Sequence, residues 1–147
     1  MKKKHHVVIA GTLILGLVLV AGTTWADGMT SSEIDPTIIG TWKWTAAETP
    51  TGSISPLPQQ DYLMSLFADG TVSMRLEFNI VNGTYTADGT TVAIEPTMAT
   101  LAAWAPVSPA PRLIELVVQA REYRVVDRRL ELETLGGQGR LVFEQTD

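Results

Sequence analysis

The sequence predicts an α+β protein that is mainly antiparallel β: a curled sheet or small barrel of about eight strands with one helix, preceded by an N-terminal signal helix. Three observations lead to this fold class. Apolar and polar residues alternate from Val72 to Glu77, which is the period of a strand with one buried face. Glycine-containing turn pairs separate the β-forming runs. A single helical stripe of apolar residues follows several prolines late in the chain.

The N-terminus has the composition of a secretory signal peptide. A basic start precedes an uncharged apolar run at 7–22, and small residues follow at Thr24 and Ala26. We expect cleavage between Ala26 and Asp27, which leaves an exported protein, periplasmic or extracellular. The alternative is an uncleaved membrane anchor, because the stretch 7–26 is close to the ~20 residues that a spanning helix needs. No Cys follows the run, which excludes the usual bacterial lipid-anchored lipoprotein.

The chain is expected to have three parts: a signal peptide at 1–26, a flexible N-terminal segment at 27–37 and one folded domain at 38–147. After residue 26 it carries eight Lys and Arg against 16 Asp and Glu. This acidic balance argues against nucleic acid or an anionic membrane as a partner. No stable membrane insertion is expected after the signal is cleaved.

The positions of His and the lack of Cys exclude several kinds of catalytic and metal site. Both His residues lie within the first six residues, and the chain has no Cys. The mature protein therefore cannot use Ser-His-Asp or Cys-His nucleophilic catalysis, or the usual zinc sites. We expect no enzyme activity and no cofactor or metal, and a domain that folds without disulfides.

The first strand is expected at 38–45, where Trp42 and Trp44 are two residues apart and share one face. The segment 46–60 contains three prolines and a glycine, which predicts a long surface loop. A second strand is expected at 62–67.

A central meander of strands follows. Its turns are expected at three pairs: Asp69-Gly70, Asn82-Gly83 and Asp88-Gly89. After the first turn, alternate residues form one buried face: Val72, Met74, Leu76 and Phe78. The last strand of the meander, at 91–95, is expected to end at Pro96.

The C-terminal third predicts a helix and then three strands. The helix follows from apolar residues at offsets of one, three, four and seven: Leu113, Ile114, Leu116, Val117 and Ala120. A strand at 123–126 and a turn at Asp127-Arg128 come next. In the following strand, leucines alternate with Glu131 and Glu133. A flexible turn at 136–139 precedes the closing strand, 141–143.

Several short motifs occur in a fixed order along the chain: Gly40, Trp42, Asp69, Gly70, Asn79, Gly83, Tyr85 and Thr100. In their order and spacing, from about residue 39 to 143, the chain resembles the META domain family, also called HslJ-like after a bacterial heat-shock protein. The resemblance implies a mostly antiparallel α+β fold. It also implies an exported or envelope protein, in a family loosely associated with stress, drug tolerance and, in some parasites, motility or virulence. The family has no established catalytic residues, so none is carried over.

The chain departs from the family at two positions. The family often carries one Cys before the central Asn and a second Cys after the threonine. The resemblance places Phe78 and Trp104 at these positions. We expect the two aromatic side chains to pack on each other, edge to face. Any family role that needs the thiols is lost here.

Two pairs of residues are candidates for a functional role. Trp42 and Trp44 could form a stacking platform, but a core anchor is favoured because large aromatic residues are mostly buried. Glu131 and Glu133 could be the carboxylate pair of a glycosidase. A solvated cross-strand ladder of charges with nearby arginines is the simpler interpretation: Arg124, Arg128 and Arg129.

We therefore expect a non-enzymatic binding protein or an accessory protein of envelope stress, with an unidentified protein as partner. Its binding surface is expected on the rigid sheet's loops, at 46–60 and 106–111. The alternative is a lipocalin-like carrier of a small apolar ligand, since Gly40 and Trp42 also resemble the first strand of lipocalins. A closed apolar cavity would favour the carrier. A filled core with an exposed apolar patch would favour a protein partner.

Overall fold

The computed structural model of the protein describes residues 33–100 and 102–147. All strand pairings in this part of the chain are antiparallel. The strands are β1 (Gly40–Thr49), β2 (Gly52–Ile54), β3 (Tyr62–Leu66), β4 (Thr71–Leu76), β5 (Asn79–Ala87), β6 (Val92–Ala99), β7 (Ala120–Val126), β8 (Arg129–Thr134) and β9 (Arg140–Gln145). The helices are α1 (Ala110–Gln119) and two short 3₁₀ turns, η1 (Pro36–Ile38) and η2 (Leu135–Gly137).

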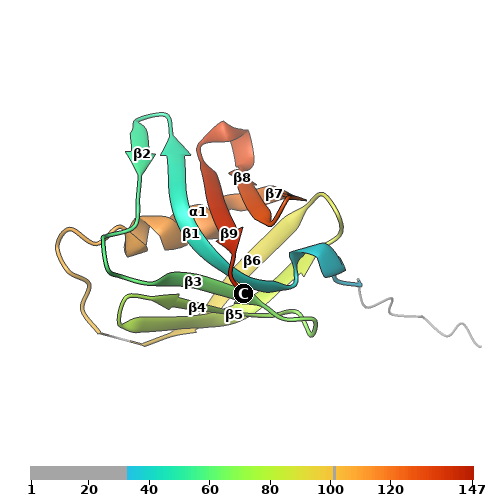
Figure 1. Cartoon of the computed structure of the whole chain (residues 1–147), viewed down its shortest axis with the longest axis horizontal. Helices are drawn as coiled ribbons and strands as arrows, with labels where there is room; N and C mark the ends of the chain where they lie inside the picture. Colours follow the sequence, from blue (N-terminus) through green and yellow to red (C-terminus); the bar gives the residue numbers. More distant parts are fainter. Residues whose placement is uncertain (1–32, 101) are drawn as a thin grey trace, which may run out of the picture.

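The strands form one sheet in the order β6-β5-β4-β3-β1-β9-β8-β7, with β2 paired to β1. Figure 1 shows the sheet curling back on itself, with α1 passing behind β1. The two end strands approach each other at one point, because Thr91 and Glu122 form an isolated antiparallel bridge. The structure therefore confirms the predicted fold class, as a curled half-barrel with one helix.

Bulky side chains fill the inside of the sheet. Trp42 and Trp44 are 0% and 1% exposed, so their prediction as core anchors is confirmed. The ring of Trp44 meets that of Tyr62 edge to face, with centroids 5.4 Å apart and planes at 71°. Buried indole N–H groups need partners, and Trp42 donates to the carbonyl of Ile38 at 2.8 Å. The interior is thus a packed core, as is usual for small barrels.

Helix α1 forms where the apolar stripe predicts it, except that Ala120, expected in the stripe, is the first residue of β7. Leu113, Leu116 and Val117 face the core and are fully or almost fully buried. Pro111 lies in the first turn, where a missing N–H costs nothing. The hydroxyl oxygen of Ser108 accepts a hydrogen bond from the N–H of Ala110 at 3.1 Å, which satisfies one free donor of the helix start.

The prediction of a turn at Asn82-Gly83 is wrong. Both residues lie inside β5, and Gly83 pairs with Val72 on one side and Pro96 on the other. The ladder with β6 shifts register at Asn82/Gly83, and a Cβ on Gly83 would lie 2.2 Å from the Glu95 carbonyl oxygen. The glycine serves close strand approach at a bulge, not a turn.

The actual turn between β4 and β5 is Glu77-Phe78. Glu77 has a φ of 57°, which few non-glycine residues adopt. The predicted buried face is correct for Val72, Met74 and Leu76, and wrong for Phe78, which is 79% exposed.

Two predicted strand ends are also wrong. β1 continues to Thr49 and turns back into β2, so the expected loop at 46–60 begins as a hairpin. β6 passes through Pro96 and ends at Ala99. Proline is tolerated there because β6 lies at the edge of the sheet.

The N-terminal part of the described chain is attached to the sheet, because the Asp35 N–H donates to the Ala87 carbonyl of β5 at 3.0 Å. The carboxylate of Asp35 accepts hydrogen bonds from the N–H and hydroxyl of Thr37, at 2.9 and 2.8 Å, which caps η1.

The proposed signal peptide and its cleavage site, and most of the segment expected to be flexible, lie outside the described residues. Within the described part, no helix is long and apolar enough to cross a membrane.

Candidate binding surfaces

Three exposed apolar side chains gather where β5 begins and β6 ends. Phe78 is 79%, Ile80 43% and Met98 70% exposed. Met98 pairs with Asn82 across the ladder. Ile80 and Met98 are therefore diagonal neighbours, and the side chains of such neighbours can touch. We call Phe78, Ile80 and Met98 the apolar strip.

A buried amide holds the chain next to the apolar strip. Asn79 is 1% exposed, and its Oδ1 accepts hydrogen bonds from the Thr100 hydroxyl at 2.9 Å and the Ala102 N–H at 3.0 Å. Its Nδ2 donates to the Ala102 carbonyl at 3.0 Å. The N–H of Ile80 donates in turn to the Thr100 hydroxyl oxygen at 2.9 Å. Two residues of the proposed family motif, Asn79 and Thr100, thus form one structural network.

Glu77 fixes the turn that presents Phe78. Its Oε1 accepts hydrogen bonds from the Tyr62 hydroxyl at 2.6 Å and the Ser108 hydroxyl at 2.5 Å. Burial and the hydrogen bond to Glu77 raise the pKa of Tyr62 to about 12. Because Ser108 follows Val107, which is 74% exposed, the same contact brings an apolar residue of the 106–111 segment to this end of the molecule.

Sequence analysis missed the role of Glu77. A glutamate in the left-handed region has no sequence signature, and its partners are 15 and 31 residues away.

The predicted packing of Phe78 on Trp104 is wrong. Phe78 lies in the β4–β5 turn and is mostly exposed, so it adds no buried aromatic area. Trp104 is half-buried and packs against the main core. The turn points the position before Asn79 outward, whereas Asn79 itself points inward.

The remaining motif residues serve the fold. Gly40 begins β1 with a φ of 147°. Asp69 accepts a hydrogen bond from the Thr71 N–H at 2.9 Å and so closes the predicted turn with Gly70. Tyr85 is 3% exposed, its N–H donates to the Gly70 carbonyl at 2.7 Å, and its hydroxyl donates to the Phe67 carbonyl at 2.8 Å.

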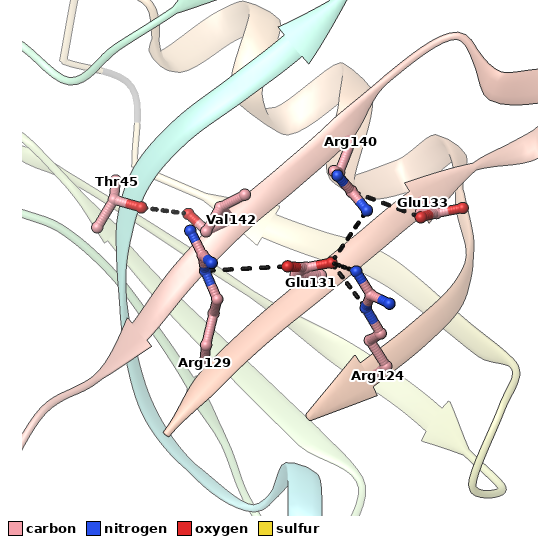
Figure 2. A network of polar contacts seen from close by, with 7 residues as sticks. All are labelled: Thr45, Arg124, Arg129, Glu131, Glu133, Arg140 and Val142. Carbon is pink, nitrogen blue, oxygen red and sulfur yellow. Dashed lines mark hydrogen bonds and ion pairs between the residues drawn. The ribbon is translucent and has the colours of Figure 1, made fainter. Parts of the chain in front are cut away.

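A second surface is the cluster of charges on the outer face of β7, β8 and β9, drawn in Figure 2. At its centre is Glu131, whose side chain is only 11% exposed. Its Oε2 accepts hydrogen bonds from Nε and Nη2 of Arg124, at 2.8 and 2.5 Å. Arg140 Nη2 lies 3.4 Å from the same oxygen, and Arg129 Nε lies 3.9 Å from Oε1. We call these four residues the Glu131 cluster.

The predicted cross-strand charge ladder is thus present, with one correction. Glu133 is exposed and contacts Arg140 at 3.5 Å, as a solvated ladder requires, but Glu131 is largely covered by the arginines. Burial raises the pKa of Glu131, and the Arg124 hydrogen bond with the charges of Arg140, Arg124 and Arg129 lowers it by more, so the net pKa is below its usual value. Arg128, also expected in the ladder, pairs instead with Asp147 at 2.5 Å.

A third surface feature lies between the edge strand β6 and helix α1. It is an open depression of about 610 Å³. Its lining is mostly apolar: Ala93, Ile94, Pro96, Ile114 and Val118, with Glu95 and Arg121. The sheet is not closed by strand pairing along this part of β6, and α1 covers it instead.

Comparisons with known proteins identify the fold. No family model matches the sequence, and no curated protein matches it. The structure is similar to that of a DUF4847 family protein from Bacteroides vulgatus, with a TM-score of 0.56 and 20% identity over 74% of this chain and 94% of that chain. It is also similar to an NMR structure of a protein from Burkholderia xenovorans, with a TM-score of 0.57 and 16% identity over 73% of this chain and 81% of that one. At these identities the likeness shows the fold alone.

Proposed function

We propose that the protein is an exported, non-enzymatic binding module of the META or HslJ-like type, which serves the cell envelope by binding a protein partner through its apolar strip. The observation that carries the proposal is the place of the apolar side chains. The inside of the sheet is occupied by large aromatic and aliphatic residues, while Phe78, Ile80 and Met98 face solvent together. Exposed apolar groups of this kind mark protein interaction sites.

The rigidity of the apolar strip also supports a protein partner. Asn79 and Glu77 hold the two ends of the apolar strip through buried or half-buried hydrogen bonds. A surface that is already ordered loses little entropy on binding, which favours affinity. Val107 adds apolar area at the same end.

The META resemblance supports the envelope role. The Asn79–Thr100 hydrogen bond gives a physical reason for two motif residues to occur together, 21 positions apart. The basic and apolar N-terminus supports export. The absence of His and Cys from the mature sequence supports a role without catalysis.

A second candidate function is favoured by the depression between β6 and α1. A small apolar ligand would fit against Ile94, Ile114 and Val118, which line this open groove. The site of a lipocalin-like carrier would then lie at the edge of the sheet, because the interior is filled.

Site-specific photocrosslinking in the producing cells tests the proposal. A photoreactive phenylalanine analogue is placed at position 78 or 98, and in a control at position 135, since Leu135 is 73% exposed but lies in η2. We expect one discrete protein adduct from positions 78 and 98 and none from 135. Equal adducts from all three positions, or none from 78 and 98, would contradict the proposed surface.

A further inference from the structure

Positive charge is concentrated on one face of an acidic protein. Of the eight Lys and Arg after residue 26, five are on β7–β9 or the turn between β7 and β8. Arg121 lines the depression beside α1, and the other four are Arg124, Arg128, Arg129 and Arg140. Lys43 on β1 joins these four, because it pairs with Glu144 of β9 in the ladder. Carboxylates share this face, since the ladders place Glu48, Glu131, Glu133 and Glu144 opposite these basic residues.

The guanidinium groups of the Glu131 cluster keep donors unused. Arg124 directs two N–H groups at one oxygen of Glu131. Arg129 and Arg140 approach carboxylates at 3.4 to 3.9 Å, but form no hydrogen bond to any of the described residues. A guanidinium has five N–H donors in a fork that matches carboxylate or phosphate oxygens. Donors are therefore available next to one another on the same surface.

Glu131 makes this crowding of positive charge possible. Three guanidiniums within 4 Å of one carboxylate would repel one another without it. Because β8 fixes the carboxylate, the three arginines converge from neighbouring strands, as Figure 2 shows. Glu131 is therefore a positioning residue, and three guanidiniums surround its single carboxylate.

An open depression of about 660 Å³ lies beside the cluster. Arginines and acids both line it: Arg124, Arg128, Arg129, Asp127, Glu131 and Glu144, with Val126 and Gln145. Arg128 is already paired with Asp147, and Glu144 lies opposite Lys43 and Arg129 in the ladder. Arg140 lies outside this depression, where Glu133 is 3.5 Å from it and Glu48 lies opposite it in the β1–β9 ladder.

We propose that the Glu131 cluster is a binding site for the oxyanion group of a ligand, a phosphate or a carboxylate, held by Arg129 and Arg140 with Arg124. The charged N–H donors form short hydrogen bonds to the anion, which are stronger than those between neutral groups. This site is independent of the apolar strip and goes beyond the proposed function.

The test is a titration of the protein, purified from the producing cells, with inorganic phosphate and separately with succinate, at constant ionic strength and pH 7. Binding is followed by NMR at the arginine Nε–H groups. We expect saturable shifts at Arg124, Arg129 and Arg140 with at least one of the two probes, and the stronger probe indicates the type of oxyanion. Shifts that do not saturate with either probe would overturn the proposal.

Two variants and a control make the titration specific. Arg129→Gln is expected to weaken binding at least about tenfold, because a charged donor pair is lost. Arg112→Gln removes an exposed arginine that pairs with Glu115 on α1, and is expected to leave binding unchanged. If Arg112→Gln weakens binding as much as Arg129→Gln, the effect is general screening and the proposal fails.

Glu131→Gln separates a binding site from a purely structural ladder. The folded state of this variant is first checked by circular dichroism. Removing the internal carboxylate lets the three guanidiniums that Glu131 gathers move apart, so anion binding is expected to weaken several-fold. In a structural ladder without an anion site, no saturable binding would appear in this variant either. If Glu131→Gln does not fold, Glu133→Gln replaces it. This change removes an exposed carboxylate that competes with the anion for Arg140, so binding is expected to tighten, and unchanged binding would contradict the proposal.

Discussion

Glu131 shows how a charge can be buried on the outer face of a sheet. The aliphatic stems and guanidiniums of its neighbours cover it, so its carboxylate loses water but gains three positive charges. The attraction exceeds the desolvation cost, because the pKa of Glu131 is lowered in spite of burial. The residue is thus held ionised, which is what both the ladder and the proposed anion site need.

Glu131 should make folding stability depend on acid pH. A carboxyl whose folded pKa is lowered contributes stability above its unfolded pKa of about 4.3, and this contribution disappears as the pH falls through the folded pKa. Glu131→Gln is therefore expected to lower the free energy of unfolding by about 1–3 kcal/mol at pH 7. The difference from the wild type should shrink below about pH 4. Urea unfolding at a series of pH values measures this. A difference that stays constant down to pH 2 would contradict it.

Gly83 is a residue whose role depends on a neighbour far from it in sequence. Its pair with Asn82 is typical of a hairpin turn, yet both residues are in a strand. The deciding fact is the approach of the Glu95 backbone, which is not visible in the local sequence. The same limit explains Phe78, which continues the alternation pattern but lies two residues beyond the end of β4.

Gly83→Ala should therefore destabilise the protein strongly, by about 3 kcal/mol, because the new methyl group would overlap the backbone of β6. The matched control is Gly137→Ala. Gly137 has a φ of 69° but no atom within 4 Å of its Cβ position, so only the backbone strain of about 1 kcal/mol applies. Thermal unfolding of both variants measures the difference. Equal destabilisation would show that Gly83 is not needed for close packing.

At the level of elements, the contact between β7 and the β5–β6 turn, which we call the seam, joins the two ends of the curled sheet at one point. The Tyr123 N–H donates to the Thr90 carbonyl at 2.9 Å, and its hydroxyl donates to Asp35 at 2.5 Å. The same hydroxyl oxygen accepts a hydrogen bond from the Gly89 N–H at 2.7 Å. Hydrogen bonds from the backbone and hydroxyl of Thr91 and the backbone of Thr90 lower the pKa of Asp88 to about 2, so this turn stays charged and ordered. The seam thus joins three segments far apart in sequence.

Tyr123→Phe should loosen this seam without disturbing the core. The ring remains, but the Asp35 carboxylate and the Gly89 N–H lose their shared partner, at a cost of about 1–2 kcal/mol. Amide hydrogen exchange should accelerate most at Gly89 and Tyr123. Tyr85→Phe is the control, since its hydroxyl contacts the β3–β4 turn instead. Uniform acceleration through the whole sheet would show that the seam is not a separate unit.

How well each element can be predicted depends on whether residues near it in sequence or distant ones determine it. The helix and the 72–76 strand follow from periodicity, which a buried face imposes locally. The extension of β1 into the β1–β2 hairpin, and the passage of β6 through Pro96, depend on tertiary neighbours. The position of a strand in the sheet decides whether a proline is tolerated, and single residues do not carry that information.

At the scale of the whole molecule, one sheet carries an apolar surface and a charged surface. The apolar strip lies over β5 and β6, and the Glu131 cluster lies over β7–β9. The arginines of the cluster and the apolar residues were visible in the sequence. Their grouping was not, because it depends on the strand order, which places β9 between β1 and β8. The apolar strip, together with the filled interior, leads to the proposed role in binding a protein.

Native mass spectrometry of the protein purified from the producing cells tests this central claim most directly. We expect a complex with a second polypeptide that is lost in Phe78→Ser combined with Met98→Ser. The complex should survive in Leu135→Ser, which removes an equally exposed apolar residue elsewhere. A tightly bound small molecule in place of a polypeptide, retained in the double variant, would contradict the account and favour the carrier.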